Sequence, residues 1–121
     1  MRIVTVTNQK GGVGKTTLVC HLALAGAERG LRTLVVDLDT QGNASTMLAR
    51  DAAVAGQPGG AAALFADAPL APTVTASGLH LLHGHQHLDE VDQRVGLADS
   101  RRVRDRLRAL PYDLVVIDTP P

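Results

Sequence analysis

Apolar and polar residues follow one another along the chain in a way that predicts strands and helices in turn. Residues 2–7 are rich in β-branched side chains and predict a strand that ends at Asn8. Over residues 15–29, apolar positions recur at helical spacing, and Gly30 stands where a helix C-cap is expected. Residues 34–36 are apolar without alternation, which is typical of a strand buried on both faces of a parallel sheet.

The rest of the chain continues this alternation. The expected elements are a short helix over 42–50, a loop over 57–60, an alanine-rich piece over 61–66, a third strand over 79–82, a helix over 98–110 and a fourth strand over 114–117. Strands that alternate with helices favour an α/β fold, in which helices flank a parallel sheet and the crossovers are right-handed. The 121 residues have room for one domain, which we place over 1–121.

Composition narrows the class of protein. A hydrophobic share of 45% with 20% charged residues fits a globular core and excludes a disordered or fibrous chain. Twelve basic and twelve acidic residues cancel, so no overall field draws the chain to nucleic acid or to a membrane. The single cysteine, Cys20, excludes an internal disulfide, and no apolar run approaches the ~20 residues that span a bilayer. We therefore expect a cytoplasmic protein without a membrane segment.

A glycine-rich turn between the first strand and the first helix carries the strongest chemical signal. Gly11, Gly12 and Gly14 lie between Lys10 and Lys15, which are the only lysines among twelve basic residues. Glycines let the backbone wrap around phosphate oxygens, while the amides and the helix N-terminus supply partial positive charge. The turn therefore predicts a phosphate-binding loop, and an ordinary glycine turn with two exposed lysines is the alternative.

The residues of this loop have definite roles in a nucleotide site. Lys15 would reach the β- and γ-phosphates, the Thr16 hydroxyl would bind Mg²⁺, and Thr17 would lie near the α-phosphate. The candidate nucleotide-binding residues are Gly11, Gly12, Val13, Gly14, Lys15, Thr16 and Thr17. The general phosphate-loop pattern has a glycine where this chain has Gln9, so the strict pattern is not matched.

The run Lys-Gly-Gly-x-Gly-Lys-Thr-Thr over 10–17 resembles the deviant Walker A motif of the ParA and MinD family of ATPases. The resemblance implies that Lys10 reaches across a dimer to the partner's nucleotide. It also makes Lys10 and Lys15 candidate catalytic residues, together with Asp39 of a second motif.

Two later segments look like further motifs of the same family. Residues 37–43 are similar to its second motif, which implies that Asp39 positions or polarises the attacking water and takes part in binding Mg²⁺. Asp37 is either structural or acts on Mg²⁺ through another ligand, and a solvated loop is the alternative for this pair of carboxylates. Residues 112–121 resemble the Walker B segment, which implies that Asp118 holds Mg²⁺ through a bound water.

The resemblance covers the whole chain and implies a fold and a function. It implies a P-loop NTPase fold and an ATPase of the short chromosomal ParA type, which binds Mg²⁺ and ATP and hydrolyses ATP slowly. An ATP-sandwiching homodimer would bind DNA without sequence preference in the nucleoid, and a ParB-like protein would stimulate hydrolysis. Because the family's fold is about twice this long, we expect an N-terminal half that stops after the Walker B strand. A truncated, non-catalytic nucleotide-binding module is the alternative.

Two clusters carry weaker signals. Four of the five histidines lie close together and suit either a polar loop or, in an extended chain, a Zn²⁺ or Ni²⁺ site. These are His80, His83, His85 and His87. Five arginines crowd the helix predicted over 98–110, where they form either a solvated face or part of a contact with DNA phosphates. These are Arg101, Arg102, Arg104, Arg106 and Arg108.

Overall fold

The computed structural model describes residues 1–7, 14–39, 41–49, 59–66, 68–84 and 97–119, and for 97–100 the backbone alone. The elements in chain order are β1 (Arg2–Val6), α1 (Lys15–Glu28), β2 (Thr33–Asp37), α2 (Asn43–Ala49), η2 (Ala61–Phe65), β3 (Thr73–Val74), β4 (His80–Leu82), α4 (Leu97–Arg108) and β5 (Leu114–Asp118). They confirm the predicted strands and helices, with small differences at the ends. None of the helices described here has the length and apolar character needed to cross a membrane.

The strands form one mainly parallel sheet in the order β1-β5-β2-β4-β3. β1, β5, β2 and β4 run parallel, and the short β3 pairs antiparallel with β4 at one edge. The expected α/β fold with a parallel sheet is therefore confirmed. The sequence predicted four strands and gave no sign of β3, because two residues are too few to show a strand pattern.

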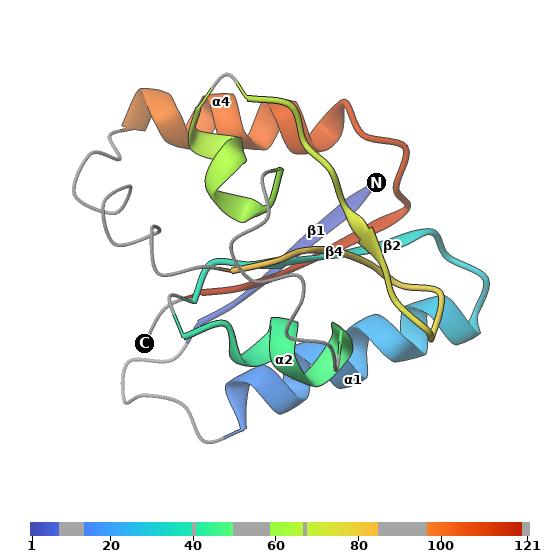
Figure 1. The fold of residues 1–121 in the computed structure, drawn as a ribbon. Coiled ribbons are helices and arrows are strands. Elements are labelled where there is room, and N and C mark those ends of the chain that lie inside the picture. The colour runs from blue at the N-terminus through green and yellow to red at the C-terminus, as the bar shows by residue number, and fades with distance from the viewer. Residues whose placement is uncertain (8–13, 40, 50–58, 67, 85–96, 120–121) are drawn as a thin grey trace.

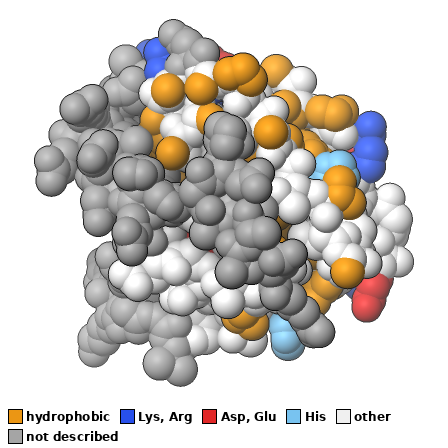
Figure 2. Space-filling model, viewed as in Figure 1, with side chains coloured by type: hydrophobic (Ala, Val, Ile, Leu, Met, Phe, Trp, Pro, Cys, Tyr) orange, Lys and Arg blue, Asp and Glu red, His pale blue; other side chains and the backbone are white. Residues whose placement is uncertain are grey.

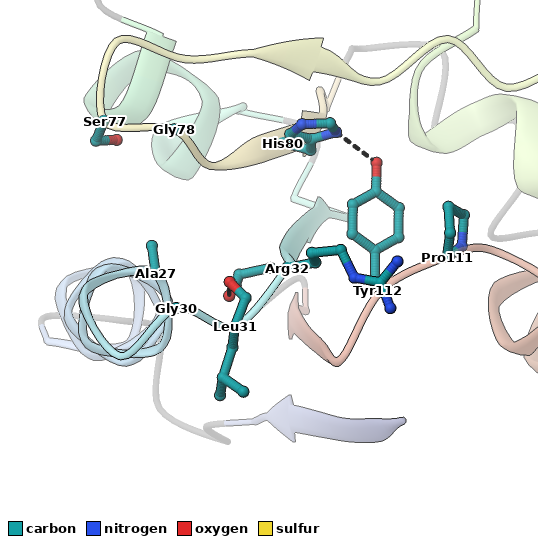
Figure 3. A pocket seen from close by; sticks show the side chains of 10 residues that line it. Ala27, Gly30, Leu31, Arg32, Ser77, Gly78, His80, Pro111 and Tyr112 are labelled. Atoms are coloured by element: carbon teal, nitrogen blue, oxygen red, sulfur yellow. Dashed lines mark hydrogen bonds between the residues drawn. The ribbon is translucent and has the colours of Figure 1, made fainter.

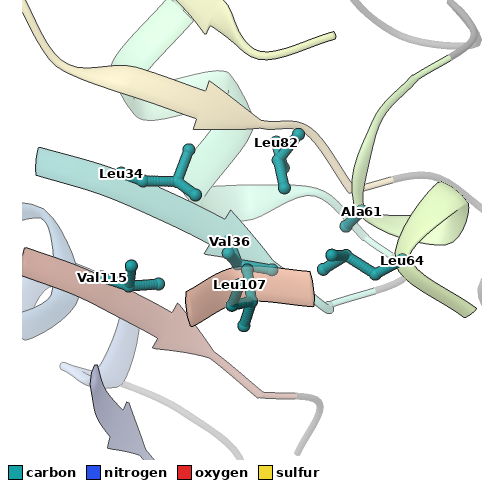
Figure 4. Close-up of a cluster of buried hydrophobic side chains, with 7 residues drawn as sticks. All are labelled: Leu34, Val36, Ala61, Leu64, Leu82, Leu107 and Val115. Carbon is teal, nitrogen blue, oxygen red and sulfur yellow. The ribbon is translucent and has the colours of Figure 1, made fainter. Parts of the chain in front are cut away.

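Helices cover both faces of the sheet, with α1 and α2 on one face and α4 and η2 on the other (Figure 1). The cluster on the α4 side (Figure 4) consists of Leu34, Val36, Ala61, Leu64, Leu82, Leu107 and Val115. The cluster on the α1 side consists of Val19, Ala23, Val35, Leu79, Leu81 and Val116. Successive residues of β2 thus enter opposite clusters, which explains why its sequence is apolar without alternation.

The parallel topology brings the carboxyl ends of β1, β2 and β5 to the same edge of the sheet. In the strand register, Val6 of β1 and Asp37 of β2 both align with Asp118 of β5. The start of α1 lies on the same side of the molecule, at the left in Figure 1. Ligands of α/β proteins bind at this edge, so the fold gathers predicted site residues where a ligand site is expected.

Candidate functional site

The start of α1 forms the first part of the site. Gly14 precedes the helix with a φ of 100°, a left-handed conformation that favours glycine. The first helical bond runs from the Leu18 N–H to the Gly14 carbonyl at 2.8 Å, so the amides of residues 15–17 come before it. These amides and the helix dipole favour an anion at this end of α1. Four other predicted loop residues, Lys10, Gly11, Gly12 and Val13, lie outside the described residues.

A buried ion pair is the centre of the site. Lys15 Nζ lies 3.0 Å from Asp118 Oδ1, and the Thr16 hydroxyl donates to Asp118 Oδ2 at 3.0 Å. The Lys15 and Asp118 side chains are 3% and 0% exposed. Within the described part of the chain, neither Lys15 Nζ nor Asp118 Oδ1 has a hydrogen-bond partner of good geometry. An ammonium group carries three donors, so burial leaves this pair short of partners.

The donor set at this pair fits a phosphate and Mg²⁺. The Lys15 ammonium and the amides at the start of α1 suit phosphate oxygens. The Thr16 hydroxyl and the Asp118 carboxylate are the hard oxygen ligands that Mg²⁺ prefers, directly or through water. The structure thus brings together three of the predicted residues, Lys15, Thr16 and Asp118, from opposite ends of the chain.

Asp37 lies at the end of β2 and is completely buried. Its Oδ1 accepts a hydrogen bond from the Asp39 amide at 3.0 Å. Its Oδ2 accepts bonds from the Ser45 amide at 2.9 Å and the Ser45 hydroxyl at 2.7 Å. Burial raises the pKa of Asp37 from 3.8 to about 6, although the bonds from Ser45 and Asp39 act in the opposite direction. These contacts give Asp37 a structural place between β2 and α2.

Asp39 lies in the loop that follows β2 and is 4% exposed. Its Oδ1 accepts a hydrogen bond from the Gln41 amide at 3.0 Å, and its Oδ2 accepts one from Asn43 Nδ2 at 3.2 Å. The two carboxylates predicted as a pair therefore differ in surroundings. Asp37 is bound into the fold by three donors, whereas Asp39 is held in a tight loop near the edge of the sheet.

Negative charge gathers around the carboxyl edge. The described residues of the site include three buried carboxylates, Asp37, Asp39 and Asp118, and one buried ammonium, Lys15. Burial, together with the charges of Asp118 and Asp37, raises the pKa of the Cys20 thiol to about 11. Cys20 therefore stays a protonated packing residue of α1 at neutral pH. A divalent cation would offset this excess of negative charge.

Three residues of the site, Ser45, Gly84 and Thr119, were not predicted from the sequence. The Ser45 hydroxyl accepts a bond from the Gly84 amide at 2.9 Å while it donates to Asp37. The Thr119 hydroxyl donates to the Val6 carbonyl at 2.7 Å and so ties the segment after β5 to the end of β1. A hydroxyl residue in the first turn of a predicted helix was the only sequence signal for Ser45.

The histidine cluster is divided between the structure's described and undescribed parts. His80 Nδ1 is hydrogen-bonded to the Tyr112 hydroxyl at 2.7 Å, and His83 is buried beyond the end of β4. His85 and His87 lie outside the described residues. Among the side chains that are described, no group of three or more potential ligands could hold a metal ion. The described part of the chain therefore does not support the alternative of a histidine metal site.

A pocket lies at the opposite, amino edge of the sheet (Figure 3). This pocket has a volume of about 370 Å³, and its lining includes Arg32, His80 and Tyr112. The rings of His80 and Tyr112 meet edge to face with centroids 5.3 Å apart. Arg32 Nη2 pairs with Asp113 at 3.3 Å. His80 and Tyr112 thus bind each other and Arg32 binds Asp113, so each of these polar side chains has a structural role.

The arginines of α4 are not all part of a solvated face. Arg102 Nη2 donates to the Phe65 carbonyl at 2.8 Å, and Arg106 donates to the carbonyls of Ala63, Ala66 and Ala68. Arg102 and Arg106 therefore attach η2 to α4. In Figure 2, hydrophobic side chains lie over α4 and the chain that leads into β3, with Lys and Arg side chains at the margins.

The fold and the site together define a class of protein. A glycine turn, a helix N-terminus and a buried lysine–aspartate pair at the carboxyl edge of a parallel sheet are the features of a P-loop nucleotide-binding protein. A family model described as "AAA domain" matches residues 1–121. The chromosome-partitioning ATPase Soj of Thermus thermophilus is 42% identical over 123 residues, which cover 100% of this chain and 47% of Soj. The chain belongs to this AAA-domain family, and its similarity to Soj agrees with the resemblance of its motifs to the ParA and MinD family.

Solved structures share the fold. Cobyrinic acid a,c-diamide synthase from Mycobacterium smegmatis with bound ADP and magnesium superposes with a TM-score of 0.85 and 34% identity, over 99% of this chain and 51% of that one. The pNOB8 ParA bound to nonspecific DNA superposes with a TM-score of 0.76 and 25% identity, over 99% of this chain and 46% of that one. The chain therefore spans about half the length of the relatives it matches.

Proposed function

We propose that this chain binds Mg²⁺ and ATP at the carboxyl edge of its sheet, as part of a ParA-type ATPase that acts in chromosome or plasmid partitioning. The observation that carries the proposal is the buried contact of Lys15 and Thr16 with Asp118. Soj of T. thermophilus is a chromosome-partitioning ATPase, and the M. smegmatis synthase was solved with ADP and magnesium, which supports the same chemistry here.

The residues of the site would divide the work of ATP hydrolysis. Lys15 and the amides at the start of α1 would hold the phosphates, and Thr16 and Asp118 would hold Mg²⁺, which neutralises phosphate charge when bound. Phosphoryl transfer to water depends mainly on alignment and charge stabilisation. We assign the attacking water to Asp39, because each carboxylate oxygen that accepts a bond from Gln41 or Asn43 has capacity for another. Lys10 would reach the partner's nucleotide in a dimer.

The proposal includes partners and a location. The ATP-bound chain would form a homodimer, bind DNA without sequence preference and respond to a ParB-like protein that stimulates hydrolysis. It would work at the nucleoid, in the cytoplasm, without a membrane. The pNOB8 ParA was solved on nonspecific DNA, which supports the DNA contact. Because this chain has a net charge of zero, such a contact would come from local groups rather than from an overall field.

Three substitutions in the natural full-length protein test these roles. We expect Lys15→Ala to abolish ATP binding and Lys10→Ala to keep binding but block dimerisation. Asp39→Ala should keep the ATP-bound dimer and slow hydrolysis by about 100-fold or more. Arg104→Ala, on the exposed side of α4, is the control and should change neither binding nor turnover. ATP binding by Lys15→Ala would contradict the site, and unaltered turnover in Asp39→Ala would contradict the role of that carboxylate.

A second candidate is a nucleotide-binding module without catalysis. The chain spans about half of Soj, and large apolar side chains of β1 and α1 or next to them are exposed, namely Met1, Val4, Leu18 and Leu22. In a longer family domain such a surface would pack against further chain. ATP binding without turnover by the natural protein would favour the module, whereas turnover would exclude it. An intact mass about twice that of these 121 residues would support the enzyme.

A further inference from the structure

The Ser45 hydroxyl joins three segments that are distant in sequence. It donates to Asp37 Oδ2 at the end of β2, at 2.7 Å, and accepts from the Gly84 amide beyond β4, at 2.9 Å. Ser45 itself lies in the first turn of α2, where its own amide also donates to Asp37 Oδ2. The oxygen is buried, with one donor and one acceptor partner, so its loss would leave the Gly84 amide without this acceptor.

Asp37 carries this connection on to Asp39. The Asp37 Oδ1 atom accepts the Asp39 amide at 3.0 Å, so the same carboxylate holds Ser45 with one oxygen and the Asp39 backbone with the other. The Asp39 side chain is bound in turn by Asn43, which is the first residue of α2. Both the backbone and the carboxylate of Asp39 are therefore placed relative to α2, and Ser45 helps to fix α2 against the sheet.

Gly84, which lies beyond β4, is also close to Asp37 and Asp39. A Cβ at this position would lie 2.6 Å from the Asp39 carbonyl and 3.0 Å from Asp37 Cγ. The chain beyond β4 thus packs directly against the backbone that carries Asp37 and Asp39. Glycine allows this approach, and it lets the Gly84 amide reach the Ser45 oxygen.

We propose that Ser45 is a positioning residue for Asp39, acting through the bonds of its hydroxyl to Asp37 and Gly84. The proposal rests on the proposed function, in which Asp39 aligns the attacking water. A small displacement of an aligning group slows the chemical step by about 100-fold, while substrate binding that uses other atoms is retained. Loss of the Ser45 hydroxyl should therefore lower kcat and leave the affinity for MgATP nearly unchanged.

The test compares Ser45→Thr with Ser45→Val in the natural full-length protein. These variants have the same shape and differ in the hydroxyl, so their comparison separates the hydrogen bonds from the packing. We expect kcat of Ser45→Val to be about 10- to 100-fold lower than that of Ser45→Thr, with KM and the Kd of MgATP within about twofold. Ser45→Ala, which adds no atoms, should behave like Ser45→Val. Equal kcat values in the Thr and Val variants would overturn the proposal.

Amide hydrogen exchange without nucleotide gives a readout that does not depend on hydrolysis. The Asp39 and Gly84 amides should be protected in the wild type and in Ser45→Thr, and should exchange about tenfold or more faster in Ser45→Val and Ser45→Ala. Equal protection in all four proteins would overturn the proposal. If the four proteins show this pattern of protection but the wild type never hydrolyses ATP, the proposed function is overturned. The linkage through Ser45 then still stands.

Discussion

Lys15 and Asp118 are buried together at the start of α1, with Nζ and Oδ1 3.0 Å apart. Removing two charges from water has a desolvation cost, which is offset well only when both groups are fully hydrogen-bonded. Among the described residues this pair lacks such bonds at the Lys15 Nζ and Asp118 Oδ1 atoms. The pair is therefore better suited to exchanging its partners for a phosphate and a metal ion than to stabilising the fold.

The buried Asp37 makes stability depend on pH in a predictable direction. Burial raises its pKa from 3.8 to about 6, so the native state holds this proton more tightly than the unfolded chain does. The stabilisation is full below the unfolded pKa and is lost as the pH rises through about 6. Between about pH 4 and pH 7, we expect the wild type to lose about 1 to 3 kcal/mol of unfolding free energy relative to Asp37→Asn.

Urea unfolding of both proteins across this pH range, in buffer free of metal and nucleotide, measures the difference. Asp37→Asn also changes hydrogen bonds to Ser45, but that effect is a constant offset and does not alter the pH dependence. Parallel pH profiles for the two proteins would show that Asp37 titrates alike in the folded and unfolded states.

At the scale of elements, η2 depends on α4 for its position. Arg106 donates to the carbonyls of Ala63, Ala66 and Ala68, in and just after η2, with the Ala66 and Ala68 bonds at 2.6 Å. The planar guanidinium donates through two separate nitrogens, Nη1 and Nη2, whereas the ammonium group of a lysine donates through one. The arginines that were predicted as a solvated or DNA-binding face therefore include at least one that organises the fold.

Arg106→Lys tests this role while keeping the charge. We expect it to lower the free energy of unfolding by about 1 to 3 kcal/mol, because charge-assisted bonds to partly buried carbonyls are lost. Arg104→Lys is the matched control, since Arg104 is exposed and, among the described residues, pairs with the exposed Asp105 at 3.4 Å. It should change stability by less than about 0.5 kcal/mol. Chemical denaturation gives both values. Equal effects of the two substitutions would show that Arg106 does not hold η2.

The sequence predicted the elements better than the contacts between them. Helical spacing over 15–29 and the apolar run at 34–36 gave α1 and β2, because both patterns extend over enough residues to be distinctive. β3 was not predictable, because its pairing with β4 involves only two residues and depends on the turn between them. Motifs located Lys15 and Asp118, since each motif has its own local spacing.

At the scale of the whole molecule, the parallel sheet creates the contacts that local sequence could not show. Ser45 and Gly84 are 39 residues apart and meet only because β2 and β4 are neighbours that end at the same edge. Thr16 and Asp118 are 102 residues apart and meet because β5 lies between β1 and β2. The strand order therefore determines which side chains surround the site, and that order was not available from the hydrophobic pattern.

We propose above all that the carboxyl edge around Lys15 and Asp118 binds ATP and Mg²⁺ together. Calorimetric titration of the natural full-length protein with ATP, in the presence and absence of Mg²⁺, measures this directly. We expect saturable binding that Mg²⁺ strengthens, and a loss of about 10- to 100-fold in Mg²⁺-dependent affinity for Asp118→Asn. Asp105→Asn, an exposed control on α4, should bind as the wild type does. No binding by the wild type, or equal Mg²⁺-dependent affinity in Asp118→Asn, would contradict the claim.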